Sequence, residues 1–317
     1  MAARQKELKI AAVAVLAVAL LCSAILVRFA FAQSNPTGFA LQRNQNVSAP
    51  VPARRIVSLV PALTEILFAV GAGPQVVGVS SYDDFPPEVQ SRPRVGALFD
   101  PDRERILSLK PDLVILYASQ TDLEGQFART GIRMYAYRHA GIANVLKTIR
   151  DVGALTGHAA DSERVARDLQ SQLDAIRARV RGRPRPRTML VMGRDALALR
   201  GVFVSGGVGF LHELLEAAGG DDVFADLKRE GVQPSNETIL VRAPDVIIET
   251  HASAPPAPDV IAKERAVWMQ LPSIPAVRSG RIYLLYGGYL VSPGPRLAQA
   301  AEAFARVLHP EVGVRPR

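Results

Sequence analysis

The chain has 317 residues, of which 48% are hydrophobic and 21% are charged, and this is enough material for two domains with buried cores. Its one cysteine, Cys22, excludes an internal disulfide and any metal site built from several cysteines. The formal net charge is +8, but the densest basic run, residues 179–187, contains a glycine and two prolines and no aromatic side chain. That composition is typical of a solvated connector and argues against a nucleic-acid surface, which interleaves basic and aromatic residues.

Residues 1–32 have the pattern of a signal peptide. A basic start precedes a long apolar run, which ends in an Ala-Phe-Ala box at residues 30–32 of the kind that signal peptidase cleaves. The apolar run is also long enough to cross a bilayer, so an uncleaved membrane anchor is the alternative. Both readings place the remaining chain outside the cytoplasm, and we expect a periplasmic protein. Residues 33–53 are rich in Asn, Gln, Pro and Ser and are expected to form a flexible linker.

The first informative element is "RIVSLVPALTEILFAVG", residues 55–71. Its residues 56–60 are typical of a short buried strand, and Pro61 ends that strand because proline has no backbone N–H to donate. Apolar residues then recur at helical spacing up to Gly71, where a helix would end. The chain therefore passes from a strand directly into the N-terminus of a helix, and α/β proteins bind ligands at such junctions. Pro61 and Ala62 are accordingly candidate ligand contacts.

An internal repeat organises the rest of the chain. "LTEILFAVGAG" from Leu63 matches "LHELLEAAGG" from Leu211, and "ERILSLKPDLVILY" from Glu104 matches "ETILVRAPDVIIET" from Glu237. The two matches occur in the same order, and glutamate, isoleucine, leucine, proline and aspartate keep identical offsets in the second. One architectural unit is therefore used twice.

Each unit is predicted to combine a short helix with a buried strand. The expected helices cover residues 104–110 and 237–241, and the expected strands cover 113–117 and 246–250. Asp100 and Pro101 are the start signals of the first helix, and Ser235 is the expected cap of the second. The strands are apolar on successive residues, as in parallel sheets that are buried on both faces, so each unit is a small α/β sandwich.

A long amphipathic helix is predicted between the units, over Asp161–Val180, because its apolar residues form one stripe and no turn residue interrupts it. A strand, "RTMLVM", opens the second half at Arg187. The predicted fold class is α/β, with two Rossmann-like lobes joined by one long rigid helix and a ligand cleft between the lobes. The expected boundaries are an N-terminal lobe over 54–155, the bridging helix over 156–182, a C-terminal lobe over 183–309 and a tail over 310–317.

The segments at 55–71, "VVGVSSYDDFPPEV" and "ERILSLKPDLVI" resemble the periplasmic substrate-binding proteins of helical-backbone type, which serve ABC importers of cobalamin, ferric siderophores and haem. The resemblance covers residues 54–309 and is strongest to the cobalamin-binding branch. It implies a receptor without catalytic residues or cofactor, acting as a monomer with a membrane permease. In that family one glutamate at the tip of each lobe docks onto the permease, and Glu104 and Glu237 match those positions. A glutamate in the first turn of a helix is also favoured by the helix dipole, which is the ordinary alternative for each residue.

The resemblance and the positions of the aromatic residues suggest a cleft for a flat metal chelate. Tyr82 matches a tyrosine of the cobalamin branch, and aromatic side chains suit a large planar macrocycle. The other candidate contacts are Phe99, Tyr117, Arg200, Tyr286 and Tyr289. In the segment "YGGYLVSPGPR" this chain is nearly neutral until Arg296, whereas cobalamin binders carry charges there.

Three ligands and one different class of protein stay open. Haem would use His139 or Tyr82 as an axial ligand. An anionic siderophore would be bound by arginines, for which Arg138, Arg194 and Arg200 are candidates. The ordinary alternative for each of these arginines is a solvated surface residue. The scattered histidines do not have the spacing of a metal cluster, so no metal site is predicted. An exported hydrolase is the different class, but neither "GVSSY" nor "VFVSGG" has the spacing of a nucleophile elbow.

Overall fold

The computed structural model describes residues 51–312. The predicted signal peptide and most of the predicted linker lie outside these residues. Within 51–312, the helices are all too short or too polar to cross a membrane.

The N-terminal lobe is built on a sheet of four parallel strands in the order β2-β1-β3-β4. The strands are β1 (Ile56–Ser58), β2 (Val76–Val79), β3 (Leu113–Tyr117) and β4 (Arg133–Tyr137). The helices of this lobe are α2 (Pro61–Ala69), α3 (Arg103–Ser108), α4 (Thr121–Phe127) and α5 (Ile142–Thr156). The inner strand β3 is buried along almost its whole length, as its continuous apolar sequence predicts.

The C-terminal lobe is built on a mixed sheet in the order β10-β9-β5-β6-β8, with β7 beside β5. The strands are β5 (Arg187–Gly193), β6 (Phe203–Ser205), β7 (Asp221–Asp222), β8 (Gly231–Val232), β9 (Val246–His251) and β10 (Ile282–Tyr286). The strands β10, β9 and β5 are parallel, and β6 and β8 are antiparallel to their neighbours. The helices are α7 (Phe210–Ala217), α8 (Asn236–Arg242), α9 (Pro258–Ala266), α10 (Pro275–Arg278) and α11 (Leu297–Leu308).

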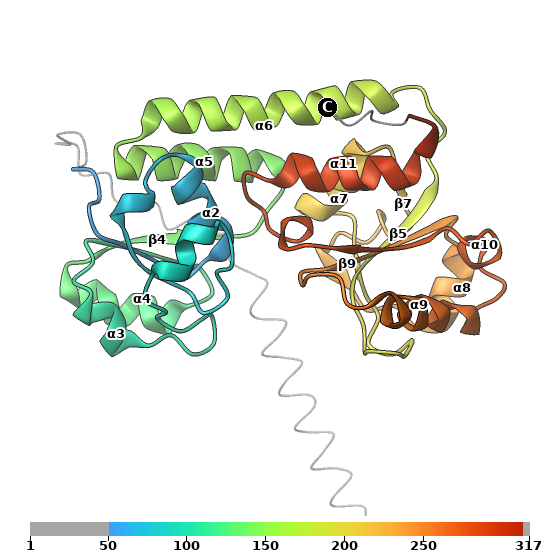
Figure 1. Cartoon of the computed structure of the whole chain (residues 1–317), viewed down its shortest axis with the longest axis horizontal. Helices are drawn as coiled ribbons and strands as arrows, with labels where there is room; N and C mark the ends of the chain where they lie inside the picture. The colour runs from blue at the N-terminus through green and yellow to red at the C-terminus, as the bar shows by residue number, and fades with distance from the viewer. Residues whose placement is uncertain (1–50, 313–317) are drawn as a thin grey trace, which may run out of the picture. The chain divides into compact units, whose positions relative to one another are not determined.

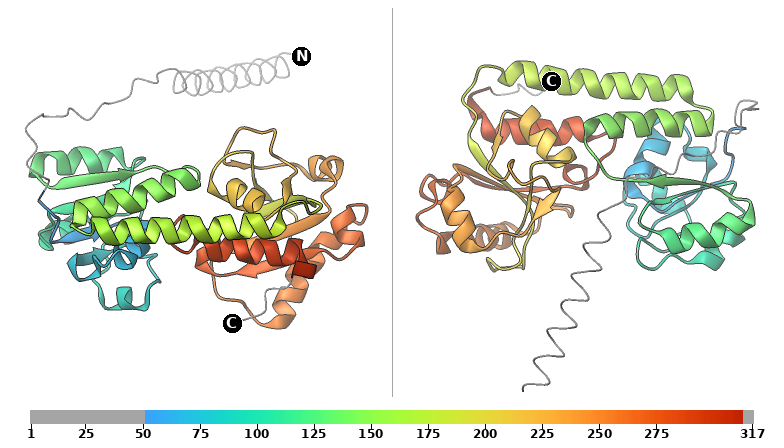
Figure 2. Two further views of the ribbon diagram at one scale, coloured as in Figure 1. Left: turned by 90° about the horizontal axis from the view of Figure 1, so that it is seen from above. Right: turned by 180° about the vertical axis from the view of Figure 1, so that it is seen from behind.

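The predicted connecting helix is α6 (Ala159–Val180), which runs beside α5 and then beside α11 (Figures 1 and 2). It turns back from α5 at Gly157, which has a φ of 81° and therefore suits a residue without a side chain. Leu169, Leu173 and Ile176 form its buried stripe. One hydrophobic core contains this stripe together with side chains of α2 and α5 from the first lobe and of α7 and α11 from the second.

The sequence repeat is also a structural repeat. Asp112 accepts hydrogen bonds from the backbone N–H of Arg55 at 3.1 Å, and Asp245 accepts the equivalent bond from Arg187 at 3.3 Å. Lys110 and Ala243, at matching positions, both take the left-handed conformation, with φ of 48° and 43°. Each left-handed residue ends its helix, so α3 stops at Ser108 and not at the predicted residue 110.

The predicted caps had different outcomes. Ser235 caps α8 as predicted, since its hydroxyl oxygen accepts a hydrogen bond from the N–H of Thr238. In the first unit, however, the cap is Asp102, which accepts from the N–H of Arg105 at 2.9 Å, and Asp100 lies outside the helix. Asp102 is the cap because it directly precedes the helix, and its carboxylate therefore reaches the free N–H groups of the first turn.

Two glutamates at equivalent positions of the repeat each reach into the other lobe. Glu65 on α2 accepts two hydrogen bonds of 2.7 Å from Arg296, the residue before α11. Glu213 on α7 accepts a hydrogen bond of 2.7 Å from the N–H of Ile142, the first residue of α5. Each carboxylate therefore lies at the N-terminal end of the last helix of the other lobe, which is α11 for Glu65 and α5 for Glu213. The helix dipole favours negative charge at such a position. We call Glu65, Glu213 and their partners the interlobe clasp.

Candidate functional site

A cleft of about 250 Å³ lies where the two lobes face each other. From the first lobe it is lined by Pro61, Ala62, Glu65, Tyr82, Asp84, Tyr117 and His139. From the second lobe it is lined by Ala252, Gly288, Val291, Ser292 and Pro293. The first set follows the carboxyl ends of all four parallel strands, which is where open α/β sheets place their ligands.

Aromatic rings make up one wall of the cleft. Tyr117 stacks on His139 with ring centres 5.8 Å apart, and His139 in turn stacks on Phe210 of the second lobe at 6.4 Å. The ring of Tyr82 is different, because it is 72% exposed and belongs to a loop that follows β2. An exposed ring at the mouth of a cleft has its face available for a flat ligand.

The arginine that binds the lining residue Glu65 is already occupied. Arg296 binds both carboxylate oxygens of Glu65, which is only 5% exposed, and its other side lies 3.8 Å from the ring centre of Phe85. Ser292 also donates its hydroxyl hydrogen to Glu65. The residues that line the cleft therefore include acidic groups but no arginine or lysine that is free to pair with an anionic ligand.

A buried carboxyl group lies behind the cleft. Asp83 is 3% exposed and follows Tyr82, and neither of its carboxyl oxygens has a hydrogen-bond partner among the described residues. Burial raises the pKa of Asp83 to about 7, and the neighbouring Thr64 hydroxyl and Arg94 oppose this shift without cancelling it. Burial and the proximity of Asp83 also raise the pKa of Tyr117, so the phenol of Tyr117 stays protonated at neutral pH.

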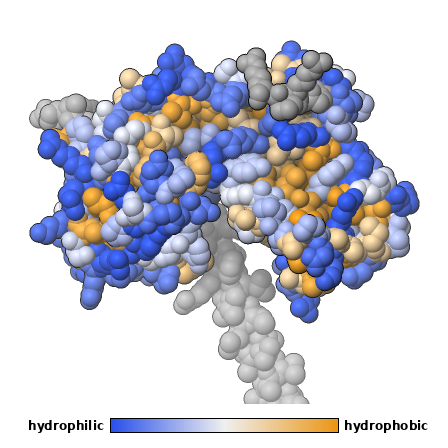
Figure 3. All heavy atoms as spheres, viewed as in Figure 1, coloured by the Kyte–Doolittle hydropathy of each residue, from blue (hydrophilic) through white to orange (hydrophobic). Residues whose placement is uncertain are grey.

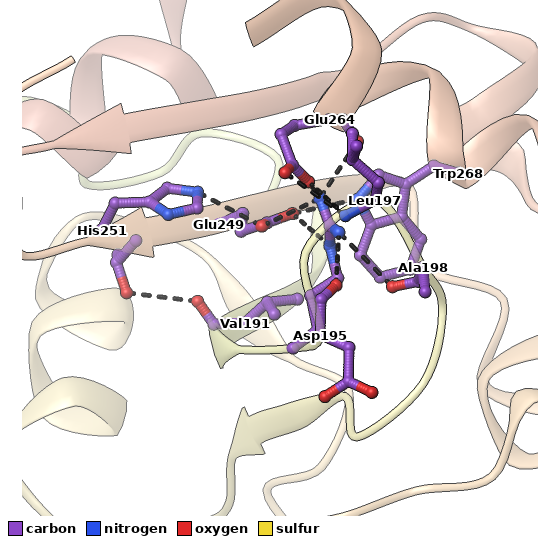
Figure 4. A network of polar contacts seen from close by, with 10 residues as sticks. Val191, Asp195, Leu197, Ala198, Glu249, His251, Glu264 and Trp268 are labelled. Atoms are coloured by element: carbon purple, nitrogen blue, oxygen red, sulfur yellow. Dashed lines mark hydrogen bonds and ion pairs between the residues drawn. The ribbon is translucent and has the colours of Figure 1, made fainter. Parts of the chain in front are cut away.

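A second cavity, of about 380 Å³, lies at the carboxyl ends of β5, β9 and β10. It shares Ala252 with the cleft and is lined by a polar network (Figure 4). At the centre of the network, Arg194 pairs with Glu249 at 3.2 Å and with Glu264 at 2.8 Å. Trp268 donates its indole N–H to Glu249 at 3.1 Å. The sequence-based reading of Arg194 as a solvated arginine is wrong, because its side chain is 2% exposed.

The predicted ligand contacts do not all lie in one place. Pro61, Ala62, Tyr82 and Tyr117 line the cleft, whereas Tyr286 lines the second cavity. The remaining three candidates line neither cavity. Phe99 is 92% exposed on the loop before α3, Arg200 is exposed and pairs with Asp195 at 2.6 Å, and Tyr289 packs against the core.

The two predicted docking residues lie at equivalent positions of the two lobes. Glu104 is exposed in the first turn of α3, and Glu237 is exposed in the first turn of α8. A hydrogen bond from Ser235 lowers the pKa of Glu237, so this carboxylate is charged at neutral pH. Most of the molecular face shown in Figure 3 is hydrophilic. Exposed carboxylates such as those of Glu104 and Glu237 are suited to recognition by a partner of opposite charge.

Several site residues were missed by the sequence reasoning. Glu65 carried a signal, since it stands in the repeat opposite Glu213. His251 and Glu249 carried none, because they alternate along a strand whose apolar residues dominate the pattern. Among residues 51–312, no group of three or more His, Cys, Asp or Glu side chains is placed to hold a metal ion.

Comparison with known proteins places this architecture among binding proteins. Residues 56–287 match the family model described as periplasmic binding protein. The vitamin B12-binding protein of Salmonella typhimurium is 31% identical over 258 residues, which cover 81% of this chain and 90% of that protein. An uncharacterised ABC transporter substrate-binding lipoprotein of Bacillus subtilis, YvrC, is 28% identical and is covered over 84% of both chains.

Solved structures have the same fold. The periplasmic vitamin B12-binding protein BtuF of Vibrio cholerae is similar with a TM-score of 0.69 and 25% identity, over 81% of this chain and 97% of that one. The periplasmic heme-binding protein RhuT of Roseiflexus sp. RS-1 has a TM-score of 0.69 and 26% identity, over 82% of this chain and 100% of that one. These similarities agree with the predicted fold class of two α/β lobes and a connecting helix.

Proposed function

We propose that this chain, which belongs to the periplasmic binding protein family, is the extracytoplasmic solute-binding component of an ABC importer and captures a cobalamin-like corrinoid. The ligand would lie in the cleft between the lobes, and the permease of the importer would be the partner that receives it. Relatives named for vitamin B12 binding and for ABC transport support this assignment.

The charge of the residues that line the cleft is the observation that favours a corrinoid over the other ligands. Its lining residues offer acidic and neutral side chains, and the guanidinium of Arg296, which contacts the lining residue Glu65, is held by that carboxylate. A corrinoid has a periphery of uncharged carboxamides, which both donate and accept hydrogen bonds. Ferric catecholates are anionic and need cationic partners, which this cleft lacks among its lining residues.

The face of Tyr82 and the small residues Pro61 and Ala62 supply an apolar surface for the macrocycle. Their positions are fixed before the ligand arrives, because Pro61 and Ala62 begin α2 and the loop of Tyr82 contains two prolines. A pre-formed surface costs little conformational entropy on binding.

Haem is the second candidate, because Tyr82 and His139 both line the cleft and both side chains can coordinate iron. The propionates of haem, however, would meet Asp84 and Glu65 without a free arginine. We therefore rank haem below a corrinoid.

A hydrolytic role has less support. Ser292, the serine in the cleft lining, donates its hydroxyl hydrogen to the Glu65 carboxylate and not to a histidine. A serine held in this way is not activated as a nucleophile.

Thermal unfolding with cyanocobalamin, haemin and a ferric catecholate tests the proposal. A ligand present at about 100 times its Kd stabilises the folded state by about 2.7 kcal/mol. For a protein of this size that is a rise in Tm of roughly 4–5 °C. We expect this rise with cyanocobalamin, and a rise with haemin or the catecholate alone would refute the choice of ligand.

A further inference from the structure

We infer that the cavity at the carboxyl ends of β5, β9 and β10 is an accessory subsite, which accepts a hydrogen-bond-donating arm of the ligand and rejects a carboxylate. This inference rests on the proposed function. The cavity adjoins the cleft at Ala252, which lines both, so a ligand in the cleft can extend a peripheral arm into it.

The residues that line the cavity include no free arginine or lysine. Arg194 is its one lining arginine, and each of the three guanidinium nitrogens is engaged. Nε donates to Glu249, Nη1 donates to the carbonyl oxygens of Asp195 and Ala198, and Nη2 donates to the carbonyl oxygen of Glu264 and pairs with both carboxylates. One guanidinium thus faces two carboxylates, and an added carboxylate would be repelled by them with no free arginine or lysine to offset the repulsion.

The acceptor available to a ligand is Glu264. Glu249 is 1% exposed and already receives hydrogen bonds from Arg194 and Trp268, whereas the Glu264 side chain is 16% exposed at the cavity wall. A carboxylate has about four acceptor sites. The described partners of Glu264 are Arg194 and the N–H of Leu197, so it retains capacity for a donor from the ligand.

A rigid aromatic pair forms the side of the cavity nearest the strand ends. The rings of His251 and Tyr286 are 4.6 Å apart and within 14° of parallel. His251 Nε2 lies 3.2 Å from Glu249 but has no well-directed hydrogen bond among the described residues, and Figure 4 shows this ring beside the carboxylate. The pair therefore gives the arm a flat wall, while the acidic groups set the polarity that the arm must have.

A primary carboxamide meets these requirements, because its NH₂ group donates hydrogen bonds and it carries no charge. Hydrolysis of the same amide to a carboxylate removes the donors and adds a negative charge. The subsite should therefore distinguish two ligands that are otherwise almost identical in size and shape.

The experiment is calorimetric titration at pH 7 with cyanocobalamin and with its monocarboxylate isomers, in each of which one peripheral amide is hydrolysed. We expect the wild-type protein to bind at least one isomer about tenfold more weakly than cyanocobalamin. In Glu264→Gln, a neutral side chain of the same shape, that difference should fall to about threefold or less. Asp259→Asn is the matched control, since it removes a solvent-exposed charge from the same helix, α9, and should leave the difference unchanged.

A second variant covers the case in which Glu264→Gln does not fold. Ser253→Phe adds a ring at an exposed position of the cavity wall, away from the buried network, and should weaken cyanocobalamin binding by filling the subsite. If cyanocobalamin binds the wild type but all isomers bind equally well, or neither variant changes binding, the subsite is overturned and the proposed function stands. If cyanocobalamin itself does not bind, the proposed function is overturned, and the subsite with it.

Discussion

The interlobe clasp makes a quantitative prediction, because its two glutamates are equivalent in the repeat but differ in burial. Glu65 is 5% exposed and forms two hydrogen bonds with Arg296, whose side chain is 16% exposed. Glu65→Gln leaves a mostly buried guanidinium without its counter-charge. Breaking a buried pair costs about 3–5 kcal/mol, and the partial exposure of Arg296 puts this case near 3 kcal/mol.

Glu213→Gln is the matched comparison. Glu213 is half-buried and accepts one backbone hydrogen bond at the start of α5, so its loss should cost about 1 kcal/mol, as for a helix cap. Thermal unfolding followed by circular dichroism should therefore show Tm reductions of roughly 5–6 °C for Glu65→Gln and roughly 2 °C for Glu213→Gln. Adding Arg296→Met to Glu65→Gln should recover part of the loss, because it removes the unpaired charge. Equal and small effects of the two single variants would refute the reasoning from burial.

Three further predictions concern the cleft and the lobe tips. The contribution of Asp83 to stability should fall as pH rises from about 4 to about 7, because folded Asp83 keeps a proton that the unfolded chain has released, so the Tm of Asp83→Asn relative to the wild type should rise over this range. Tyr82→Ala should weaken ligand binding by about 1–3 kcal/mol while Tyr82→Phe changes it little, and a large loss in Tyr82→Phe would favour coordination of iron by the phenol. Changing Glu104 and Glu237 together to alanine should abolish uptake in cells but leave ligand affinity in solution unchanged, and normal uptake would contradict the docking role.

The sequence was most informative where one local rule determined the structure. Continuous apolar runs predicted β3 and β9, the uninterrupted stripe predicted α6, and the repeat predicted equivalent positions for Glu104 and Glu237. Helix ends were less accurate, since the cap of α3 depends on whether Asp100 or Asp102 reaches the N–H of Arg105, which spacing alone does not determine.

The site was only partly predictable for a related reason. Pro61, Ala62, Tyr82 and Tyr117 follow strand ends, and strand ends can be located from sequence. Whether an arginine is free depends on contacts between segments far apart in the chain, as between Arg194 and Glu249 or between Arg296 and Glu65. The sequence pattern therefore predicts a solvated Arg194, whereas its side chain is buried at the centre of an ion-pair network.

The core that the two lobes share has a mechanical consequence. Because side chains of α2, α5, α6, α7 and α11 pack in one hydrophobic cluster, the lobes cannot swing far apart without separating apolar surfaces that are in contact. We therefore expect thermal motion alone to provide little opening. Glu104 and Glu237 belong to α3 and α8, which are distant from α6 in Figure 1. A force applied to these two helices would therefore tend to rotate the lobes relative to each other about the region of α6. If the permease docks onto both tips as proposed, we expect its own conformational change to drive release of the ligand.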